Sequence, residues 1–336
     1  MRRQAVRSGG VTTLSSAEVC AGAGGAALGL ELAGFEHELL VEIDPDACQS
    51  LRANRPAWKV IKGDIRQLDG RQLDGIDLLS GGCPCQPFSV GGRQLGDGDS
   101  RDLLPAALRL VAIARPRAVL LENVPGLLAR KFAAYRELVT GLLEALGYHW
   151  DWRVLQASDY GVPQLRPRAV LAAAAPAVMA RFRWPTTLAA TPSVGEVLAV
   201  SMASRDWERA WADAATGIAP TLAGGSRLHG GPDLGPTRAK HQWRDRLGVN
   251  GFGLANQVPG PGEFSRPPTL AELHQGTAGM PKLTTAQAAV LQGFPPGWVL
   301  VGTKTARWRQ IGNAFPPPVA AAVGRAMAAA LQGDHH

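Results

Sequence analysis

The alternation of short apolar strands with periodic helices over residues 11–180 is the feature that most limits what this chain can fold into. Strand and helix repeated in this way require crossover connections, and these build a parallel sheet with helices on both faces. We therefore expect an α/β fold with a doubly wound, mostly parallel sheet. The expected strands are 14–19, 39–43, 60–61, 76–79, 118–121, a strand around Val154 and 169–171, and the expected helices are 26–32, 46–54, 103–114 and 135–146.

The regular pattern breaks after Trp184. Residues 185–280 are rich in Gly, Pro, Thr, Ser and Arg, which predicts a second, smaller irregular domain built from turns and short strands. Helices are expected again at 284–291 and, after three prolines, at 319–331. The predicted boundaries are a first domain at 11–184 completed by 300–336, a second domain at 185–299, and a flexible N-terminus at 1–10.

Composition excludes several classes of protein. With 46% hydrophobic and 19% charged residues, the chain of 336 residues is no disordered protein, and its net charge of +7 suits a polyanionic partner without proving one. The most apolar run, 169–180, is short and broken by Pro176, and the basic N-terminus lacks the apolar core of a signal peptide. The four cysteines form no disulfide framework, so we expect a cytoplasmic protein.

A glycine-rich turn and two acids predict a nucleoside site. Gly22, Gly24 and Gly25 follow the first strand and open a helix, where backbone N–H groups are free for a ligand. Glu42 ends the second strand and can hold ribose hydroxyls, and Asp64 ends the third and can accept from an adenine amino group. The alternative interpretation is three ordinary turns between strands and loops.

A cysteine past the fourth strand is a candidate nucleophile. Cys85 lies in the run Gly-Gly-Cys-Pro-Cys-Gln-Pro-Phe-Ser at 81–89, at the carboxyl edge of the expected sheet. Cys83 and Cys85 could instead be a redox pair or half of a metal site. Cys20 and Cys48 lack the paired spacing of a zinc site, so no metal is expected.

Further polar groups follow the next strands. Glu122 comes after the apolar residues 118–121, where burial would raise its pKa and suit it to proton transfer; a salt bridge that ends the strand is the alternative. Three polar residues are spaced two apart, Gln164, Arg166 and Arg168, so we expect their side chains on one face of a strand. There they would bind a polar or anionic ligand.

Taken in this order, these elements resemble the DNA (cytosine-5) methyltransferases of bacterial restriction-modification systems. The resemblance covers about 13–180 and 281–330, and its most specific motifs are Pro-Cys-Gln-Pro-Phe-Ser at 84–89, Glu-Asn-Val at 122–124, Gln-x-Arg-x-Arg at 164–168, Leu-Gln-Gly-Phe-Pro at 291–295 and Gln-Ile-Gly-Asn-Ala-Phe-Pro-Pro at 310–317. It implies a Rossmann-like domain that binds S-adenosylmethionine at 11–184, completed by 300–336, and a target-recognition domain at 185–299.

The resemblance also implies a mechanism. Cys85 attacks carbon 6 of a cytosine flipped out of the DNA, and Glu122 protonates ring nitrogen 3. Carbon 5 of the resulting enamine takes the methyl group, after which a base removes the carbon 5 proton and the thiol leaves. Arg168, together with Arg166, holds the base oxygen, and the loop at 86–101 closes over the site.

The same resemblance assigns the methyl donor a site formed by Cys20, Gly22, Gly24, Gly25, Glu42, Ile43, Asp64, Ile65, Pro84 and Asn313. This chain departs from the family pattern at several positions. Cys20 stands where the family usually has Phe, and Ile43 stands where an aromatic residue is frequent. Ala286 and Gln287 replace the usual Arg and Glu, which could loosen the support of the recognition domain.

Double-stranded DNA is the expected macromolecular partner. The candidate DNA contacts are Gln86, Ser89, Arg101, Gln164, Arg227, Arg238, Lys240 and Arg244, with His229 and Thr237 nearby. We expect a monomer, because one chain methylates one strand at a time. A restriction endonuclease that acts on the same site is a candidate partner.

Three alternatives remain at this point. A tRNA cytosine methyltransferase would share the Cys85 and Glu122 loops, but the large segment at 185–280 favours a reader of duplex DNA. A non-catalytic DNA-binding relative would not need Cys85, Glu122 and Arg168. An oxidoreductase with a nicotinamide cofactor would share only the glycine turn.

Overall fold

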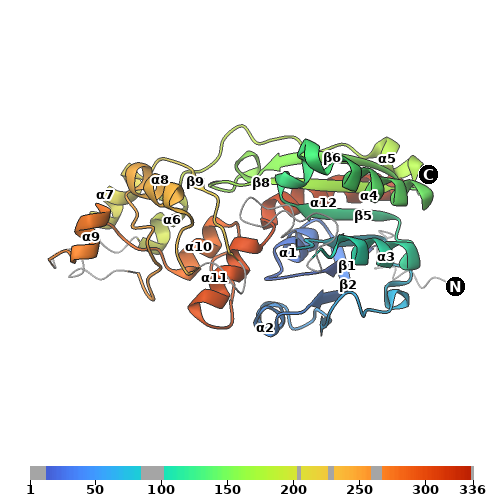
Figure 1. Ribbon diagram of the computed structural model, residues 1–336, viewed down its shortest axis with the longest axis horizontal. Coiled ribbons are helices and arrows are strands. Elements are labelled where there is room, and N and C mark those ends of the chain that lie inside the picture. The colour runs from blue at the N-terminus through green and yellow to red at the C-terminus, as the bar shows by residue number, and fades with distance from the viewer. Residues whose placement is uncertain (1–12, 85–101, 203–205, 226–230, 259–266, 334–336) are drawn as a thin grey trace. The chain divides into compact units, whose positions relative to one another are not determined.

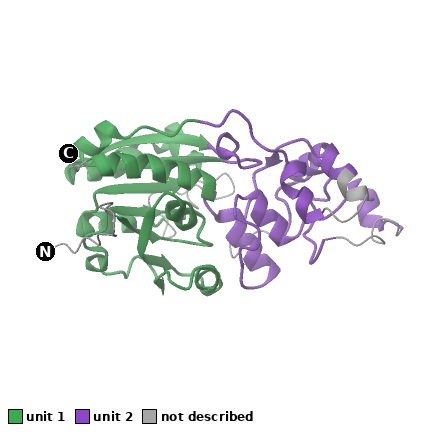
Figure 2. Ribbon diagram, turned by 180° about the vertical axis from the view of Figure 1, so that it is seen from behind, with its two compact units in different colours: residues 1–155, 167–186, 317–336 green, residues 156–166, 187–316 purple. Residues whose placement is uncertain are grey.

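The computed structural model describes residues 13–84, 102–202, 206–225, 231–258 and 267–333. The chain forms two compact units, which Figure 2 colours separately. We call the first, 1–155 with 167–186 and 317–336, the sheet unit, and the second, 156–166 with 187–316, the insert unit. The first long stretch of the sheet unit ends at residue 186, close to the predicted domain boundary at 184. Residues 156–166 and 300–316, which were predicted to belong to the first domain, lie in the insert unit.

A seven-stranded sheet forms the core of the sheet unit, in the order β3-β2-β1-β4-β5-β8-β6 (Figure 1). The neighbours from β3 to β5 pair in parallel, and β8 pairs antiparallel with β5. This confirms the predicted doubly wound, mostly parallel sheet. The strands are β1 Leu14–Val19, β2 Phe35–Glu42, β3 Val60–Lys62, β4 Leu78–Gly81, β5 Ala118–Asn123, β6 His149–Gln156 and β8 Pro167–Ala174.

One face of this sheet is covered by α3 and α4. A single apolar cluster joins Ala17 and Val19 of β1, Leu79 of β4 and Leu121 of β5 to buried side chains of these two helices. The sequence pattern located the helices of this unit to within two residues at nearly every end. The helices are α1 Gly25–Leu32, α2 Pro45–Asn54, α3 Leu104–Ala114, α4 Ala133–Ala145, α5 Pro176–Arg181 and α12 Pro317–Gln332.

The opposite face carries α1. Ser16 of β1 bonds through its hydroxyl to the ring of His37 on β2 at 2.8 Å, and the other ring nitrogen of His37 lies 2.8 Å from the carbonyl of Ala27 on α1. Helix α12 packs on α1 so closely that a Cβ atom on Gly29 would lie 2.4 Å from that of Ala320. The C-terminal helix α12 therefore packs on α1 within the sheet unit.

Within the described part of the chain, one helical stretch could span a membrane by length and composition alone, Lys304–Gln332. In its most apolar window 67% of the residues are buried inside the protein, which is typical of a core helix, so this stretch is weak evidence for a membrane span.

The segment at 185–280 is irregular, as predicted, but its regular elements are mainly short helices rather than the short strands expected. In α8, Ala239, Trp243 and Leu247 are buried at helical spacing among otherwise polar residues, and Thr269 caps α9 in a reciprocal bond with Glu272. The elements are α6 Val194–Met202, α7 Asp206–Ala214, α8 Thr237–Leu247, α9 Leu270–Gln275, α10 Thr285–Leu291, α11 Lys304–Asn313 and the paired strands β7 Gln164–Leu165 and β9 Ala219–Pro220.

The contact between α1 and α12 predicts the effect of a single methyl group. Gly29→Ala should lower the free energy of unfolding by about 1–3 kcal/mol, because the new Cβ atom meets the backbone of α12. Gly141→Ala on the exposed side of α4 is the matched control, since nothing lies within 4 Å of its Cβ position. This control should stabilise the protein by about 0.5–1 kcal/mol. Urea unfolding of both variants measures the difference, and equal effects would contradict the proposed packing.

Candidate active site

The strand order places a crevice at the carboxyl ends of β1 and β4. From β1 the chain runs outward to β2 and β3, whereas β4 is followed on its other side by β5, so the direction of winding reverses between β1 and β4. Ligands of open α/β sheets bind at such a switch point. The turn after β1 requires glycine there, because Gly22 and Gly24 have φ angles of +53° and +83°. Gly25 then begins α1.

Glu42 lies beside this turn at the end of β2. Its carboxylate accepts hydrogen bonds from the backbone N–H of Gly22 at 2.7 Å and of Asp44 at 2.8 Å. Each oxygen keeps a second lone pair, so the group can also accept from ribose hydroxyls. Burial raises the pKa of Glu42, and the backbone N–H bonds oppose this rise. Ile43, the next residue, is 60% exposed, so its side chain is open to a ligand.

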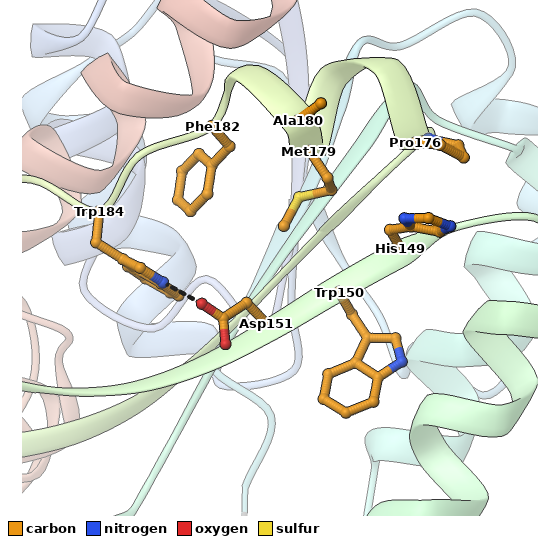
Figure 3. Close-up of a pocket in the computed structure, with 8 residues that line it drawn as sticks. All are labelled: His149, Trp150, Asp151, Pro176, Met179, Ala180, Phe182 and Trp184. Atoms are coloured by element: carbon orange, nitrogen blue, oxygen red, sulfur yellow. Dashed lines mark hydrogen bonds between the residues drawn. The ribbon is translucent and has the colours of Figure 1, made fainter.

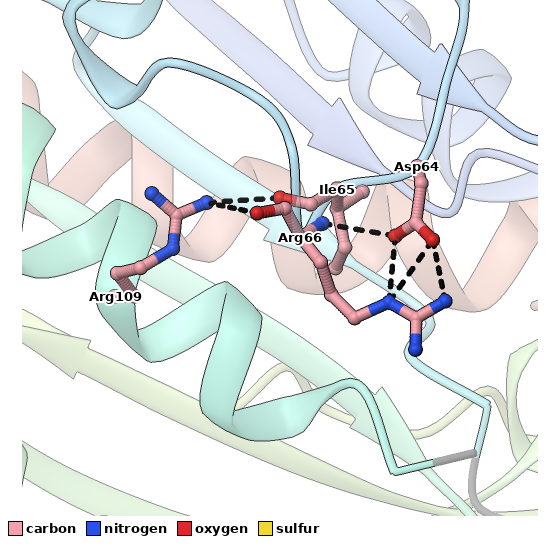
Figure 4. Close-up of polar contacts among 4 residues, drawn as sticks. All are labelled: Asp64, Ile65, Arg66 and Arg109. Atoms are coloured by element: carbon pink, nitrogen blue, oxygen red, sulfur yellow. Dashed lines mark hydrogen bonds and ion pairs between the residues drawn. The ribbon is translucent and has the colours of Figure 1, made fainter. Parts of the chain in front are cut away.

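Asp64 follows β3 and is held by Arg66 (Figure 4). The guanidinium donates to both carboxylate oxygens at 2.5–3.0 Å, and this bonding holds the pKa of Asp64 below its ordinary value. Arg109 on α3 fixes the same turn by donating to the carbonyl of Ile65 at 3.0 Å, while the side chain of Ile65 is buried. An adenine amino group that bonds Asp64 therefore shares this carboxylate with Arg66.

Cys20 and Cys83 link the glycine turn to the loop after β4. Their thiols are hydrogen-bonded to each other, and this bond and burial raise the pKa of Cys20 well above the ordinary value. Cys20 has a φ of +55°, which is unusual outside glycine. Pro84 follows Cys83 and is exposed. The predicted nucleophile and four predicted DNA contacts lie outside the described residues: Cys85, Gln86, Ser89, Arg101 and Arg227.

Glu122 and Arg168 form an ion pair at the end of β5. Arg168 Nε lies 2.7 Å from Glu122 Oε1, and the two side chains are 12% and 13% exposed. Burial lowers the pKa of Arg168, and the carboxylate of Glu122 raises it. A Cβ atom on Gly82 would lie 3.2 Å from Glu122 Oε2, so the glycine keeps this carboxylate accessible from the β4 side. Glu122 therefore ends its strand in a salt bridge, as the alternative interpretation expected, and its role in proton transfer stays a prediction.

Gln164 and Arg166 do not share a strand with Arg168. They belong to the insert unit, β8 begins at Pro167, and both side chains are fully buried. Arg166 donates to the carbonyls of Leu222, Gly312 and Ala314 at 2.7–2.9 Å. Gln164 bonds Gln292 at 2.8 Å and the N–H of Leu222 at 2.9 Å. In this structure the two side chains brace the chain around β7 rather than pointing to solvent.

The remaining predicted residues also lie in the insert unit. Asn313 is exposed and donates to the carbonyl of Gly225 at 3.3 Å. On α8, Arg238 is exposed, Lys240 pairs with Asp233 at 2.7 Å, and Arg244 bonds Asp245 at 2.6 Å and the carbonyl of Gln275 at 3.0 Å. Of the three predicted contacts on this helix, Arg238 is the most available to a partner.

Sequence reasoning missed Glu18. This acid lies inside the apolar strand β1 and is only 2% exposed. Burial raises its pKa well above the ordinary value, with further contributions from Glu42 and Glu122. A carboxyl group within a short strand of small and apolar residues was the available signal.

Figure 3 shows a hollow of about 420 Å³ elsewhere in the sheet unit, between β6 and α5. Phe182 and Trp184 face it, and the indole of Trp184 donates to Asp151 at 2.6 Å. None of the predicted site residues is among those that line it. The predicted site residues of the sheet unit that the structure describes lie instead at the carboxyl ends of β1, β2, β3 and β5.

Comparison with known proteins agrees with this arrangement. Residues 14–222 and 232–329 match the family model described as C-5 cytosine-specific DNA methylase. The chain is 49% identical over 325 residues to the type II methyltransferase M.NaeI of Lentzea aerocolonigenes, covering 95% of this chain and 76% of the relative. It is 46% identical over 328 residues to M.NgoMIV of Neisseria gonorrhoeae, covering 96% and 99%. A solved structure of a Spodoptera frugiperda DNMT2 mutant shares the fold, with a TM-score of 0.65 at 17% identity over 94% of this chain and 99% of that one.

The bonds of Arg166 predict a structural cost of removing it. Arg166→Met should lower the free energy of unfolding by about 3 kcal/mol, because three buried carbonyls lose a charged donor. Arg246→Met, an exposed position on α8 in the same unit, should change it by less than about 0.5 kcal/mol. Chemical denaturation followed by tryptophan fluorescence measures both, and an unchanged stability of Arg166→Met would show that these bonds do not brace the unit.

Proposed function

The chain belongs to the C-5 cytosine-specific DNA methylase family, and on that premise we propose that Cys85, Glu122 and Arg168 perform methyl transfer to carbon 5 of a cytosine flipped out of a specific double-stranded DNA site. The chain is a DNA (cytosine-5) methyltransferase of the restriction-modification type. Beyond this activity, we propose which residues catalyse the reaction, which methyl donor they use and which partners the chain binds.

The ion pair between Glu122 and Arg168 is the observation that carries the proposal. Cytosine carbon 5 is a poor nucleophile until a thiolate adds to carbon 6 and nitrogen 3 is protonated or hydrogen-bonded. Glu122 reaches the crevice while Arg168 fixes its orientation at 2.7 Å, and the guanidinium keeps further donors for the base oxygen. This pair supplies a nitrogen 3 partner and an oxygen partner in one rigid unit.

Cys85 supplies the nucleophile in this scheme. Its thiolate adds to carbon 6, which makes carbon 5 an enamine carbon able to take a methyl group. A base then removes the carbon 5 proton, and the electron pair expels the thiolate and restores the aromatic ring. Arg166 was also expected to hold the base, and its three internal carbonyl bonds support a bracing role for it instead.

The crevice residues fit S-adenosylmethionine. Gly22 has nothing within 4 Å of its Cβ position, and the carboxylate of Glu42 keeps lone pairs for ribose hydroxyls. Asp64 and the exposed Ile43 suit the adenine. Cys20, after β1, and the exposed Pro84, after β4, complete the proposed donor site. When bound, this donor supplies an electrophilic methyl group; the protein residues orient it and exclude water.

The insert unit is proposed to recognise the DNA sequence. Its segment at 187–280 carries none of the catalytic motifs, and α8 presents the exposed Arg238. We further propose that the chain acts as a monomer in the cytoplasm. A restriction endonuclease for the same site would be its partner, as the names of the type II relatives suggest.

Replacing the nucleophile tests the catalytic assignment. Cys85→Ser should abolish methyl transfer to DNA, with a fall in turnover of at least about 10³-fold, because a serine hydroxyl is a far weaker nucleophile than a thiolate. Donor and DNA binding should persist. Cys83→Ser, two residues away, is the matched control and should keep most of the activity. Transfer of labelled methyl groups to DNA measures both, and substantial turnover by Cys85→Ser would reject the assignment.

A domain swap tests the recognition role. Residues 187–280 are replaced by the corresponding segment of a relative with known specificity, and sequencing of bisulfite-treated DNA maps the methylated sites. The chimera should methylate the site of the donor of the segment, because base contacts lie in that segment. An active chimera that still marks the original site would show that the segment is not the reader.

A further inference from the structure

Strand register places three carboxylates on one face of the sheet. Glu18 of β1 lies opposite Leu40 of β2 and opposite Ser80 of β4, and Ser80 lies opposite Leu120 of β5. Residues in register, and residues two apart along a strand, share a face. Glu42, two residues beyond Leu40, and Glu122, two residues beyond Leu120, therefore project from the same face as Glu18.

Glu18 lies at the reversal of winding between β1 and β4. Its neighbour Ser80 has a small side chain that donates to the carbonyl of Ala17, and Gly81 and Gly82 follow with no side chains. No long side chain of β4 therefore separates Glu18 from the space between Glu42 and Glu122. Glu18 therefore lies below the carboxyl edge of the sheet, at the switch point where ligands of such sheets bind.

The neighbouring acids are satisfied, whereas Glu18 is not. Glu42 accepts from two backbone N–H groups, and Glu122 is paired with Arg168. Glu18 Oε2 is fully buried and has no hydrogen-bond partner among the described residues. A buried polar atom without a partner costs about 1–3 kcal/mol, so its retention indicates a partner that arrives with the ligand.

The surroundings of Glu18 favour its protonated form in the absence of ligand. Burial raises its pKa most, and the carboxylates of Glu42 and Glu122 raise it further. The pKa of Cys20, beyond the end of β1, is also raised, and burial lowers the pKa of the half-buried His37 on the same face, so neither group brings a charge to Glu18 near neutral pH. Arg168 is occupied by Glu122. A positive charge brought into the crevice would lower the pKa of Glu18 and release its proton.

A metal ion does not explain this cluster. Across the described ranges, no three His, Cys, Asp or Glu side chains are close enough together to hold one. The proposed methyl donor itself carries a positive charge, on its sulfonium sulfur.

We propose that Glu18 is the residue by which this enzyme distinguishes its positively charged methyl donor from the uncharged product. The inference rests on the proposed function. Donor and product share the adenosine and the amino-acid group and differ in one centre, a sulfonium in the donor and a thioether in the product. Glu18 gives its proton to solvent when the sulfonium is bound, and the carboxylate balances that charge. After methyl transfer the carboxylate takes a proton back, and its attraction for the neutral product is lost.

Calorimetric binding tests this proposal on the full chain without DNA. S-adenosylmethionine and S-adenosylhomocysteine are titrated into the wild type and Glu18→Gln at about pH 6 and about pH 7.5, in two buffers of different ionisation enthalpy. In the wild type, donor binding should release up to one proton more than product binding. The ratio of donor to product affinity should rise with pH by at most about tenfold per unit.

Glu18→Gln should lose both effects, because glutamine is neutral at every pH. Comparing the two proteins at the same pH cancels the titration of the ligands' own amino groups. Glu42→Gln is the matched control: it should weaken both ligands alike and keep most of the extra proton release, because burial raises the pKa of Glu18 more than Glu42 does. Glu18→Asp should restore part of the pH dependence, and product binding by each variant confirms that the crevice is folded.

Each outcome is decisive. Equal proton release for donor and product in the wild type overturns the proposal without any variant. A Glu18→Gln protein that binds product and keeps the wild-type preference and proton release also overturns it. Failure of the wild type to bind either ligand would instead reject the proposed donor, and so the proposed function.

Discussion

Parallel pairing of β1, β2, β4 and β5 is the constraint on which the rest of this structure depends. Because these strands run in one direction with matched registers, their carboxyl ends meet at one edge of the sheet. The glycine turn, Glu42, the loop with Cys83 and Glu122 are brought together there from segments up to 100 residues apart in sequence. The antiparallel β8 then adds Arg168 from the other direction, opposite the end of β5. A change that shifted one register by a single residue would turn these side chains to the wrong face.

The sequence predicted the sheet unit well because its elements are long, buried and periodic. The predicted strand 14–19 coincides with β1, and the predicted helix 103–114 differs from α3 by one residue. In the insert unit α10 was predicted to within one residue, but the helices between 187 and 280 were missed, because they are short and α8 among them is polar. Only every fourth residue of α8 is buried, so its average composition resembled that of a loop.

Residue roles were harder to predict than elements. The spacing of Gln164, Arg166 and Arg168 indicated one polar face, but the chain passes from one unit to the other at that point, and burial divides the three side chains. Alternation in sequence does not say whether an arginine grips a ligand or three backbone carbonyls. Glu18 was missed for the opposite reason, since a single acid in an apolar strand has no motif. Its importance appears only when the registers of β2, β4 and β5 place it between two other carboxylates.

The central claim is that Cys85 forms a covalent bond to a cytosine in DNA while the methyl donor is present. The most direct measurement uses duplex DNA that carries 5-fluorocytosine at the methylated position, incubated with the wild type and S-adenosylmethionine and separated on a denaturing gel. Fluorine cannot leave as a proton, so elimination stops after methylation and the protein stays bonded to carbon 6. The account predicts a shifted band that requires the donor and the fluorinated strand and is absent for Cys85→Ser. A wild-type enzyme that methylates the unmodified site but gives no such band would contradict it.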